Sequence, residues 1–467
     1  MQKVLLVHTK CQDVEGLVVS PPLGLMYLAS ALRKHYAEKV VVKILDLRLF
    51  QHPLTELDKN LLEFRPDIVG ISTLTVESAM MHMVAGMAKT RAPDCQVIVG
   101  GPHPTIFYEQ VLKDRNIDYA VVGEGEDSFV ELLNHIEGEG PVPPLKGVAF
   151  KEGETLIFPG NRQPINDLDS LPFPAWDLID LDLYSKFMDF NRSMGRGKYM
   201  GLFTSRSCPY QCIYCHSIFG KGFRARSPEN VLEEIRILRE RYAVEEIQFY
   251  DDCFNLDLPR AKRIGEMISA RVPGLRISFP NGIRGDIVDR EFLQIFHQAG
   301  AYALTIAVES ASPRIQKLIK KNLDLGRVRE TIHQADQLKY FVQGFFMIGF
   351  PTETKEEIQM TIDFAVNSPL QMASFWVVIP YDKTGLLKIF QEWGLQEELG
   401  FENCHYSPVR SAYQAVTGVN LFPIKRKAYL RFYVNPSRWY KGMRRIPNKK
   451  DYLLNNFVRQ ATRYLFH

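Results

Sequence analysis

The sequence predicts an α/β protein: an N-terminal doubly wound parallel sheet, then a partial (β/α) barrel, then a basic, mostly helical C-terminal region. Two observations predict the sheets. Short apolar runs alternate with helical segments over residues 1–140, and the alternation resumes at Gly201. The third observation is charge, because basic residues are concentrated after residue 420. A chain of 467 residues has room for about two to four domains.

The first domain is expected over residues 1–140. Its apolar runs are short enough for buried strands, and the segment Leu23–Tyr36 has helical periodicity after the Pro21-Pro22 start. Strands joined by helical crossovers predict a parallel, doubly wound sheet, whose ligands bind at the carboxyl ends of the strands. The expected strands are Val4–Val7, Val40–Leu45, Ile68–Ser72, Gln96–Val99 and Asp118–Val122.

A proline-rich segment over residues 141–200 is expected to be a linker, and residues 201–400 a second βα domain. Repeated strand–helix units over such a length predict a full or partial parallel barrel. The expected strands are Leu202–Ser205, Glu246–Tyr250, Arg276–Pro280, Ala303–Val308, Gln343–Ile348 and Ser374–Ile379.

Residues 401–467 are expected to form a basic C-terminal region. From residue 420 onward the chain holds twelve Lys or Arg residues and one acidic residue, Asp451, although the whole chain has a net charge of only +3. Basic residues alternate with aromatic ones, a mixture found at membrane surfaces and in nucleic-acid sites. We favour a helical cap packed on the barrel, with weak contact to an anionic membrane surface as the second interpretation, and we expect no nucleic acid.

The composition is that of a folded protein without a membrane span. The apolar fraction is 46% and the charged fraction 24%, and no apolar run approaches the ~20 residues that a spanning helix needs. The N-terminus lacks the apolar region and cleavage site of a signal peptide. We therefore expect a cytoplasmic protein.

Three of the seven cysteines crowd into the motif Cys208-x3-Cys212-x2-Cys215, just after a predicted strand. Thiolates are the ligands of iron–sulfur clusters, and three on one loop can hold three irons of a cubane. The alternative is a structural zinc completed by His216 or Cys253, but zinc sites commonly use two paired halves and the sequence has no second half. The motif therefore favours a cluster. Cys95 and Cys253 are expected to be buried.

The cysteine motif, with Tyr214 before its last cysteine, resembles that of the radical S-adenosylmethionine (SAM) superfamily. Further segments resemble the cobalamin-binding branch of that superfamily. In the first domain and the linker these are Pro21-Pro22-Leu23-Gly24-Leu25, Gly100-Gly101-Pro102-His103-Pro104-Thr105, Val122-Gly123-Glu124-Gly125-Glu126 and Leu171-Pro172-Phe173-Pro174. In the barrel they are Arg224-x-Arg226-Ser227-Pro228-Glu229, Asp251-Asp252-x-Phe254, Val308-Glu309-Ser310 and Ile348-Gly349-Phe350-Pro351-Thr352-Glu353-Thr354.

The resemblance implies a Rossmann-like B12-binding sheet followed by a radical SAM barrel. A 4Fe–4S cluster would be held by Cys208, Cys212 and Cys215. SAM would bind the iron without a protein ligand, and an electron would cleave it to a 5′-deoxyadenosyl radical. The implied cofactor-binding residues of the barrel are Tyr214, Asp251, Asp252, Arg284, Glu309 and Gly349, and those of the first domain are Pro22, Leu23, Gly24, Ser72, Gly100, Gly101, His103, Gly123, Glu124 and Gly125.

Several of these residues have a second interpretation. Asp251 and Asp252 would lie at the barrel rim or cap a helix. Glu309 would bind a ribose hydroxyl or pair with a buried partner. Arg284, like Arg226, would pair with the SAM carboxylate or be solvated at the surface. Gly349 would allow close ligand approach or form a turn, and His103 would contact the corrin or be a hydrogen-bonded loop histidine.

One motif of other B12 proteins is missing. The sequence Asp-x-His-x-x-Gly would place a histidine beneath cobalt, but His8 has Leu6 and Cys11 at the flanking positions. We therefore expect cobalamin bound base-off, with no protein histidine as lower ligand.

The resemblance implies methylation of an unactivated carbon of a small-molecule or lipid substrate, by methylcobalamin and a deoxyadenosyl radical. The alternative is an oxidative cyclase or rearrangement enzyme on the same scaffold, and a remote alternative is a non-catalytic iron–sulfur protein. An external electron donor of the flavodoxin or ferredoxin type is implied. No catalytic residue beyond the cofactor ligands can be named.

Overall fold

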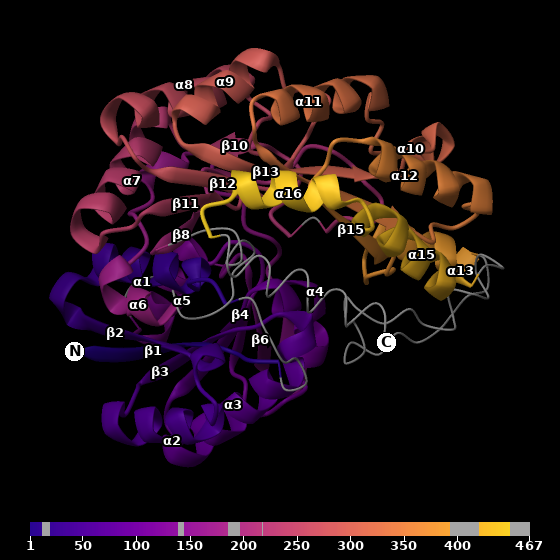
Figure 1. Ribbon diagram of the computed structural model, residues 1–467. Helices are drawn as coiled ribbons and strands as arrows, with labels where there is room; N and C mark the ends of the chain where they lie inside the picture. The colour runs from indigo at the N-terminus through magenta and orange to yellow at the C-terminus, as the bar shows by residue number, and fades with distance from the viewer. Residues whose placement is uncertain (12–18, 139–143, 185–196, 217, 393–419, 449–467) are drawn as a thin grey trace. The chain divides into compact units, whose positions relative to one another are not determined.

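The computed structural model describes residues 1–11, 19–138, 144–184, 197–216, 218–392 and 420–448. The chain divides into two compact units, the first formed mainly by residues 1–184 and the second mainly by residues 197–392 and 420–448 (Figure 1). Each unit is built around its own sheet.

The first unit contains a seven-stranded sheet in the order β2-β1-β3-β4-β5-β6-β7. The strands are β1 (Gln2–His8), β2 (Val40–Asp46), β3 (Ile68–Ser72), β4 (Gln96–Gly100), β5 (Tyr119–Val121), β6 (Val148–Glu152) and β7 (Thr155–Ile157). The strands from β2 to β5 pair in parallel, and their order reverses between β1 and β3, which is the ligand-binding point of doubly wound sheets. The predicted doubly wound sheet is confirmed.

Helices cover both faces of this sheet, because successive residues of its central strands are apolar and point to opposite sides. Val4 and Leu6 of β1 pack with one set of helices, and Leu5 and Val7 pack with the other. The first set is α1 (Leu23–Tyr36) and α5 (Glu126–Ile136), and the second is α2 (Pro53–Phe64), α3 (Ser78–Arg91) and α4 (Pro102–Val111) (Figure 1).

The sheet continues into the segment expected to be a linker. Strand β6 pairs antiparallel with β5, and β7 pairs antiparallel with β6. Val148 and Ala149 of β6 are completely buried. The many prolines around these short strands hid them in the sequence, because proline normally argues against a strand. The domain boundaries at residues 140 and 200 stay predictions.

The second unit contains a six-stranded parallel sheet in the order β15-β14-β13-β12-β11-β8. The strands are β8 (Tyr199–Leu202), β11 (Glu246–Phe249), β12 (Arg276–Ile283), β13 (Ala301–Glu309), β14 (Phe341–Ile348) and β15 (Met372–Val377). The helices among and after them are α7 (Pro228–Tyr242), α8 (Leu258–Arg271), α9 (Arg290–Gln298), α10 (Pro313–Leu318), α11 (Leu325–Gln337), α12 (Lys355–Asn367) and α13 (Gly385–Glu392). Six strands in sequence order, each joined to the next by helices, match the predicted partial barrel.

Two C-terminal helices, α15 (Leu421–Tyr433) and α16 (Pro436–Arg445), pack on this sheet. The hydroxyl of Tyr433 accepts from the amide of Ala373 (3.3 Å) and donates to its carbonyl (3.1 Å), and Tyr429 binds the backbone of Phe375 in the same way. These hydroxyls satisfy backbone groups of β15, the last strand, which would otherwise be an open edge.

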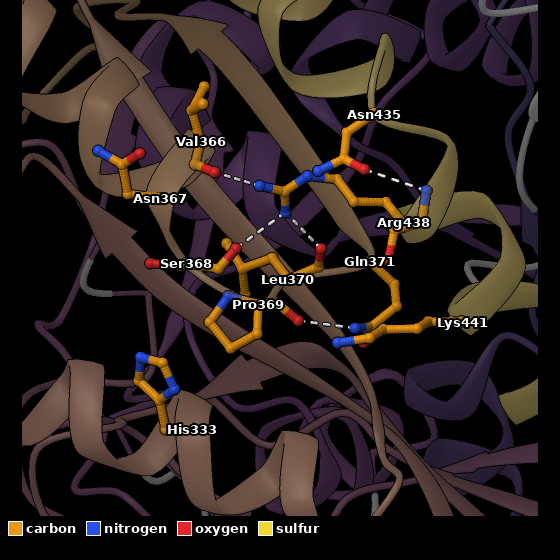
Figure 2. A pocket seen from close by; sticks show the side chains of 11 residues that line it. His333, Val366, Asn367, Ser368, Pro369, Leu370, Gln371, Asn435, Arg438 and Lys441 are labelled. Carbon is orange, nitrogen blue, oxygen red and sulfur yellow. Dashed lines mark hydrogen bonds between the residues drawn. The ribbon is translucent and has the colours of Figure 1, made fainter.

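Helix α16 is anchored by Arg438 to the end of α12. The guanidinium donates to the carbonyl oxygens of Ser368 (2.9 Å), Leu370 (2.6 Å) and Val366 (Figure 2). These residues border a pocket of about 250 Å³, which lies at the amino-terminal end of β15. The expected packing of the basic region on the barrel is confirmed for residues 420–448, and residues 449–467 lie outside the described residues.

Within the described part of the chain, none of the helices combines the length and apolarity needed to cross a bilayer. The cytoplasmic location stays a prediction.

Candidate active site

The three clustered cysteines lie on one loop at the carboxyl edge of the second sheet. The loop runs between β9 (Ser205–Arg206) and β10 (Arg224–Ala225), which pair antiparallel and close its base. Cys208 and Cys212 are half-buried and Cys215 is exposed. In contrast, Cys11, Cys95 and Cys253 are buried, as expected for the last two. The loop therefore presents three thiols at the edge of the sheet instead of packing them in the core.

Three thiols on one loop are the donor set of an iron–sulfur cluster, because a cubane distributes its thiolate ligands over separate irons. Among the described residues, no group of three or more His, Cys, Asp or Glu side chains is arranged around a single point. The choice between cluster and zinc therefore rests on the cysteine motif. The Cys253 thiol donates a hydrogen bond to Cys208, and this bond lowers the pKa of Cys208 to about 6. Burial raises the pKa of Cys215 to about 11.

Asp251 and Asp252 follow β11 but lie in different environments. Asp251 is buried and accepts hydrogen bonds from the amide and hydroxyl of Thr204 and from the hydroxyl of Ser205. It therefore braces the segment before the cysteine loop and does not cap the following helix, and its contact with SAM or substrate stays a prediction. Asp257 caps α8 instead. Asp252 is exposed and accepts from the amide of Ser207, so it does lie beside the loop.

Glu309 and Tyr214 are brought together by the fold. Glu309 ends β13 with a φ of +63°, and the Tyr214 hydroxyl lies 3.4 Å from its carboxylate. The ammonium group of Lys321 is 2.9 Å from the same carboxylate. Lys321 could not be identified from the sequence, because nothing near it in the chain distinguishes it from the other lysines.

The Gly349 turn is held by Glu353, whose carboxylate accepts from the amides of Gly349 (2.6 Å) and Phe350 (3.1 Å). Gly349 has a φ of +91°, and a Cβ there would lie 2.6 Å from a methyl group of Leu421. Packing and turn geometry thus account for the glycine. Burial raises the pKa of Glu353 to about 8.

The two arginines considered for SAM are both engaged by protein groups. Arg226 is buried and pairs with Glu234. Arg284 pairs with Asp286 at 2.8 Å and packs on the ring of Tyr210.

In the first unit, the expected cofactor-binding residues gather where the parallel strands end. Ser72 ends β3 and Gly100 ends β4. The next residue, Gly101, has a φ of +94°, and a Cβ atom at this position would lie 3.1 Å from the carbonyl oxygen of Thr73. Gly123 has a φ of +87° with open space around it. Glu124 accepts from the amide of Ile165, and a Cβ at Gly125 would lie 3.1 Å from Leu28.

The start of α1 adds residues after the same edge. Pro22 and Leu23 are buried, whereas Gly24 is exposed with open space around it. Glycines without neighbours leave room for a ligand to approach the backbone closely. The backbone at Gly24 and Gly123 is therefore open to a ligand at this edge.

Two histidines of this unit, His8 and His103, are held by protein groups. The His8 ring donates to the Thr9 carbonyl (2.9 Å), and the buried His103 packs on Phe107 with ring centres 5.1 Å apart. Burial lowers the pKa of both histidines to about 4. The absence of a histidine beneath cobalt stays a prediction.

A buried charged network supports this edge and was missed in the sequence. Arg48 pairs with Asp46 at 2.6 Å, and the hydroxyl of Tyr184 donates to Asp46 at 2.9 Å. Burial alone would raise the pKa of Asp46, but the hydrogen bonds and charge of Arg48 outweigh burial and hold this pKa below its usual value. Beside them, Glu77 accepts from Thr9 (2.7 Å).

Two family models match the chain in the same order as the two sheets. The B12 binding domain matches residues 16–133, and the radical SAM superfamily matches residues 202–365. Both agree with the motifs described in the sequence.

Similar proteins cover most of the chain. An uncharacterized methyltransferase of Pyrococcus horikoshii is 32% identical over 93% of both chains. Cytidylyl-2-hydroxyethylphosphonate methyltransferase of Streptomyces wedmorensis is 30% identical, over 79% of this chain and 77% of its own length. An anaerobic magnesium-protoporphyrin IX monomethyl ester cyclase of Cereibacter sphaeroides is 26% identical, over 93% of this chain and 70% of its own length.

Solved structures share the fold. The methyltransferase TsrM from Kitasatospora setae, solved with cobalamin and a 4Fe–4S cluster, superposes with a TM-score of 0.69 at 17% identity, over 84% of this chain and 75% of its own. OxsB, solved with aqua-cobalamin and SAM, gives a TM-score of 0.68 at 21% identity, over 90% of this chain and 58% of its own.

Proposed function

The chain belongs to the radical SAM superfamily enzymes that carry a B12-binding domain, and from this premise we propose that it methylates an unactivated carbon of a small-molecule or lipid substrate. The observation that carries the proposal is a loop of three accessible thiols at the edge of a partial barrel, in a chain whose first sheet matches a B12-binding domain. The predicted cofactors, a 4Fe–4S cluster, SAM and cobalamin, are those of this family.

The chain's own residues hold and shield these groups. When bound, the cluster with SAM supplies the deoxyadenosyl radical, and cobalamin supplies the transferable methyl group. Cys208, Cys212 and Cys215 would hold the cluster. Tyr214, Asp252 and Glu309, with Lys321 beside Glu309, would bind SAM next to it. In the first unit, cobalamin would lie on Ser72 and the glycine-rich turns, with the cofactor-binding residues Pro22, Leu23, Gly24, Gly100, Gly101, His103, Gly123, Glu124 and Gly125.

The sheet of the second unit supports a substrate with an apolar part. Phe345 and Met347 of β14 pair in register with Ser374 and Trp376 of β15, so these four side chains share one face. The opposite face holds Phe346 and Phe375, which contact α12 and α15 through Phe364 and Tyr429. Phe345 and Met347 are half-buried, and Trp376 is 38% exposed at the carboxyl edge. An apolar group of the substrate would pack there.

The experiment is an anaerobic product screen. Protein with reconstituted cluster and cobalamin is incubated with methyl-deuterated SAM, a reductant and a panel of phosphonates, polycyclic lipids and tetrapyrroles. We expect one class of compound to gain the deuterated methyl group. A panel member that is converted without gaining this label would contradict methylation.

The second candidate function is an oxidative cyclase, which is favoured by the similarity to the Cereibacter sphaeroides cyclase over 93% of this chain. In the same screen, a cyclase would yield a product that has lost hydrogen and carries no label.

We propose an external flavodoxin or ferredoxin as electron donor, because a radical SAM cluster must be reduced before each cleavage. Replacing a chemical reductant by reduced flavodoxin or by reduced ferredoxin should sustain formation of 5′-deoxyadenosine in at least one of the two cases. If neither carrier sustains it while the chemical reductant does, the proposal of these donors fails.

The outer face of α15 supports weak contact with an anionic membrane surface. Phe422, Arg426 and Leu430 recur every four residues and are exposed, and Val434, just after the helix, is 74% exposed. Each basic residue near an anionic membrane contributes ~1 kcal/mol. Sedimentation with vesicles containing phosphatidylserine should therefore fall with salt and with the double substitution R426E/K427E. Equal sedimentation of wild type and variant at low salt would contradict this contact.

A further inference from the structure

Arg284 lies directly behind the cysteine loop. It follows β12, and its guanidinium carbon is 3.9 Å from the centre of the Tyr210 ring. Tyr210 stands between Cys208 and Cys212 in the chain, so this stacking contact acts on the loop segment that joins two of the three thiols. A planar guanidinium over an aromatic face combines cation–π attraction with close packing.

The rest of the Arg284 side chain is fixed by other parts of the unit. It donates to the carbonyl of Lys321 at 3.1 Å and pairs with Asp286 at 2.8 Å. Its backbone exchanges two hydrogen bonds with the Asn255 side chain, at 2.9 and 3.1 Å. The side chain is only 11% exposed, so the guanidinium has little freedom to move.

We propose that Arg284 is a positioning residue for the iron–sulfur cluster. The Arg284 guanidinium clamps the Tyr210 ring and thereby sets the spacing of Cys208 and Cys212. The inference rests on the proposed function, because it needs the loop to hold a cluster. The same guanidinium binds the turn that carries Lys321, whose ammonium group pairs with Glu309. Arg284 thus ties the thiol loop and the Glu309 side of the site to one anchor.

This role differs from the pairing of Arg284 with the SAM carboxylate that the sequence predicts. A clamp acts on the cluster whether or not SAM is present. A SAM ligand acts only when SAM is bound. Measurements on the cluster before and after addition of SAM therefore separate the two roles.

The test uses substitutions at both partners of the stacking contact, because R284K also alters the pairing with Asp286 and the hydrogen bond to Lys321, whereas Y210L changes only the ring. R284K keeps the charge but removes the planar guanidinium, and Y210L removes the ring. Y210F keeps the ring and should behave as wild type. R329K is a matched control. The guanidinium carbon of Arg329 lies 4.6 Å from the centre of the Phe364 ring, and neither residue belongs to the cysteine loop.

Each full-length protein is reconstituted anaerobically, and iron release to a chelator and the electron paramagnetic resonance spectrum of the reduced cluster are recorded without and with SAM. Residues that support metal ligands typically contribute about 10- to 100-fold to metal affinity. We expect R284K and Y210L to retain iron about 10- to 100-fold more weakly, with altered spectra in the absence of SAM.

Several results would overturn the clamp. In the first, the R284K protein retains iron as the wild type does and has the wild-type spectrum without SAM, but it lacks the spectral change that SAM induces. Arg284 would then be a SAM ligand. If R284K fails to fold, as judged by cobalamin binding and thermal unfolding, the Y210L and Y210F pair decides, and equal iron retention by these two overturns the clamp. A wild-type protein that takes up no iron overturns the proposed function as well.

Discussion

Both units have buried charges at the carboxyl edge of the sheet, such as Asp46 in the first and Asp251 in the second, but only the second edge carries a cysteine loop, which is held by stacking and backbone contacts. Asp46, Arg48 and Tyr184 form a network beneath the first edge. At the second edge, Tyr210 stacks on Arg284, and the amide of Ile213 donates to the carbonyl of Ile319 (3.1 Å).

The difference follows from what each edge has to hold. A planar cofactor needs open backbone, which the first edge provides through turns such as that at Gly123, and the buried charges lie below it. A cluster needs accessible thiols at fixed spacing, which the second edge provides on a loop. We therefore expect the first edge to be complete without its cofactor, and the second to depend on its cluster.

The largest expected effect is the loss of one loop thiol. Cys212→Ala should reduce iron content to near background and abolish SAM cleavage, because two thiolates cannot replace three, while cobalamin binding by the first unit persists. Cys95→Ala, at a buried thiol of the first unit, should keep its iron. Iron assays and cobalamin absorbance provide the readout, and a Cys212→Ala protein with full iron content would refute the loop assignment.

The next effect breaks the network of the first unit. Arg48→Met leaves Asp46 buried without its partner, which typically costs about 3–5 kcal/mol. Arg91→Met is the matched control, since Arg91 pairs with Asp58 near the surface and exposed pairs contribute about 0–1 kcal/mol. Denaturant unfolding measures both. Equal stabilities of the two variants would show that the network does not support the edge.

His8 in the first unit and Glu353 in the second should contribute to the pH dependence of stability with opposite signs. His8 has its pKa lowered to about 4, so the unfolded chain binds the proton more tightly and the stability of the first unit rises between about pH 4 and 6.5. Glu353 has its pKa raised to about 8, so the folded form binds the proton more tightly and the stability of the second unit falls between about pH 4.5 and 8. Each shift corresponds to about 3 kcal/mol or more.

Hydrogen exchange followed by mass spectrometry measures the two units separately. Glu353→Gln should remove the loss of protection near the Gly349 turn as the pH rises. An unchanged pH profile in this variant would contradict the assignment to Glu353.

The smallest effect concerns the last strand of the second sheet. Tyr433→Phe removes the hydroxyl that binds the backbone of Ala373, and should cost about 1 kcal/mol. Tyr440→Phe removes a hydroxyl that is exposed and bound only by Arg444 among the described contacts, and should leave thermal unfolding unchanged. If both variants unfold alike, the tyrosine contacts do not stabilise β15.

The fold could be predicted because most of the parallel strands are short segments rich in apolar residues, which alternate with helical segments along the chain. Thus β1, β3 and β14 appear at the expected positions within two residues of their ends. Strands β6 and β7 were missed because they are short and stabilised by pairing with β5, which is not a local property of the sequence.

The candidate site was predictable only where its signal is local. The cysteine spacing lies within eight residues, whereas Arg284 is far along the chain from Tyr210, and Lys321 is far from Tyr214. Such pairs form only in the folded chain, so one sequence does not reveal them. Asp251 follows a buried strand, as the sequence predicts, but its hydrogen bonds from Thr204 and Ser205 join segments far apart in the chain and could not be predicted.

The central claim is that one chain uses SAM both as a radical source and as a methyl source, and counting SAM-derived products tests it most directly. Wild-type protein converting its substrate from the product screen is given methyl-deuterated SAM and a reductant. We predict 5′-deoxyadenosine and S-adenosylhomocysteine in roughly equal amounts, together with product that carries the deuterated methyl group. Formation of 5′-deoxyadenosine and product without S-adenosylhomocysteine would contradict the account.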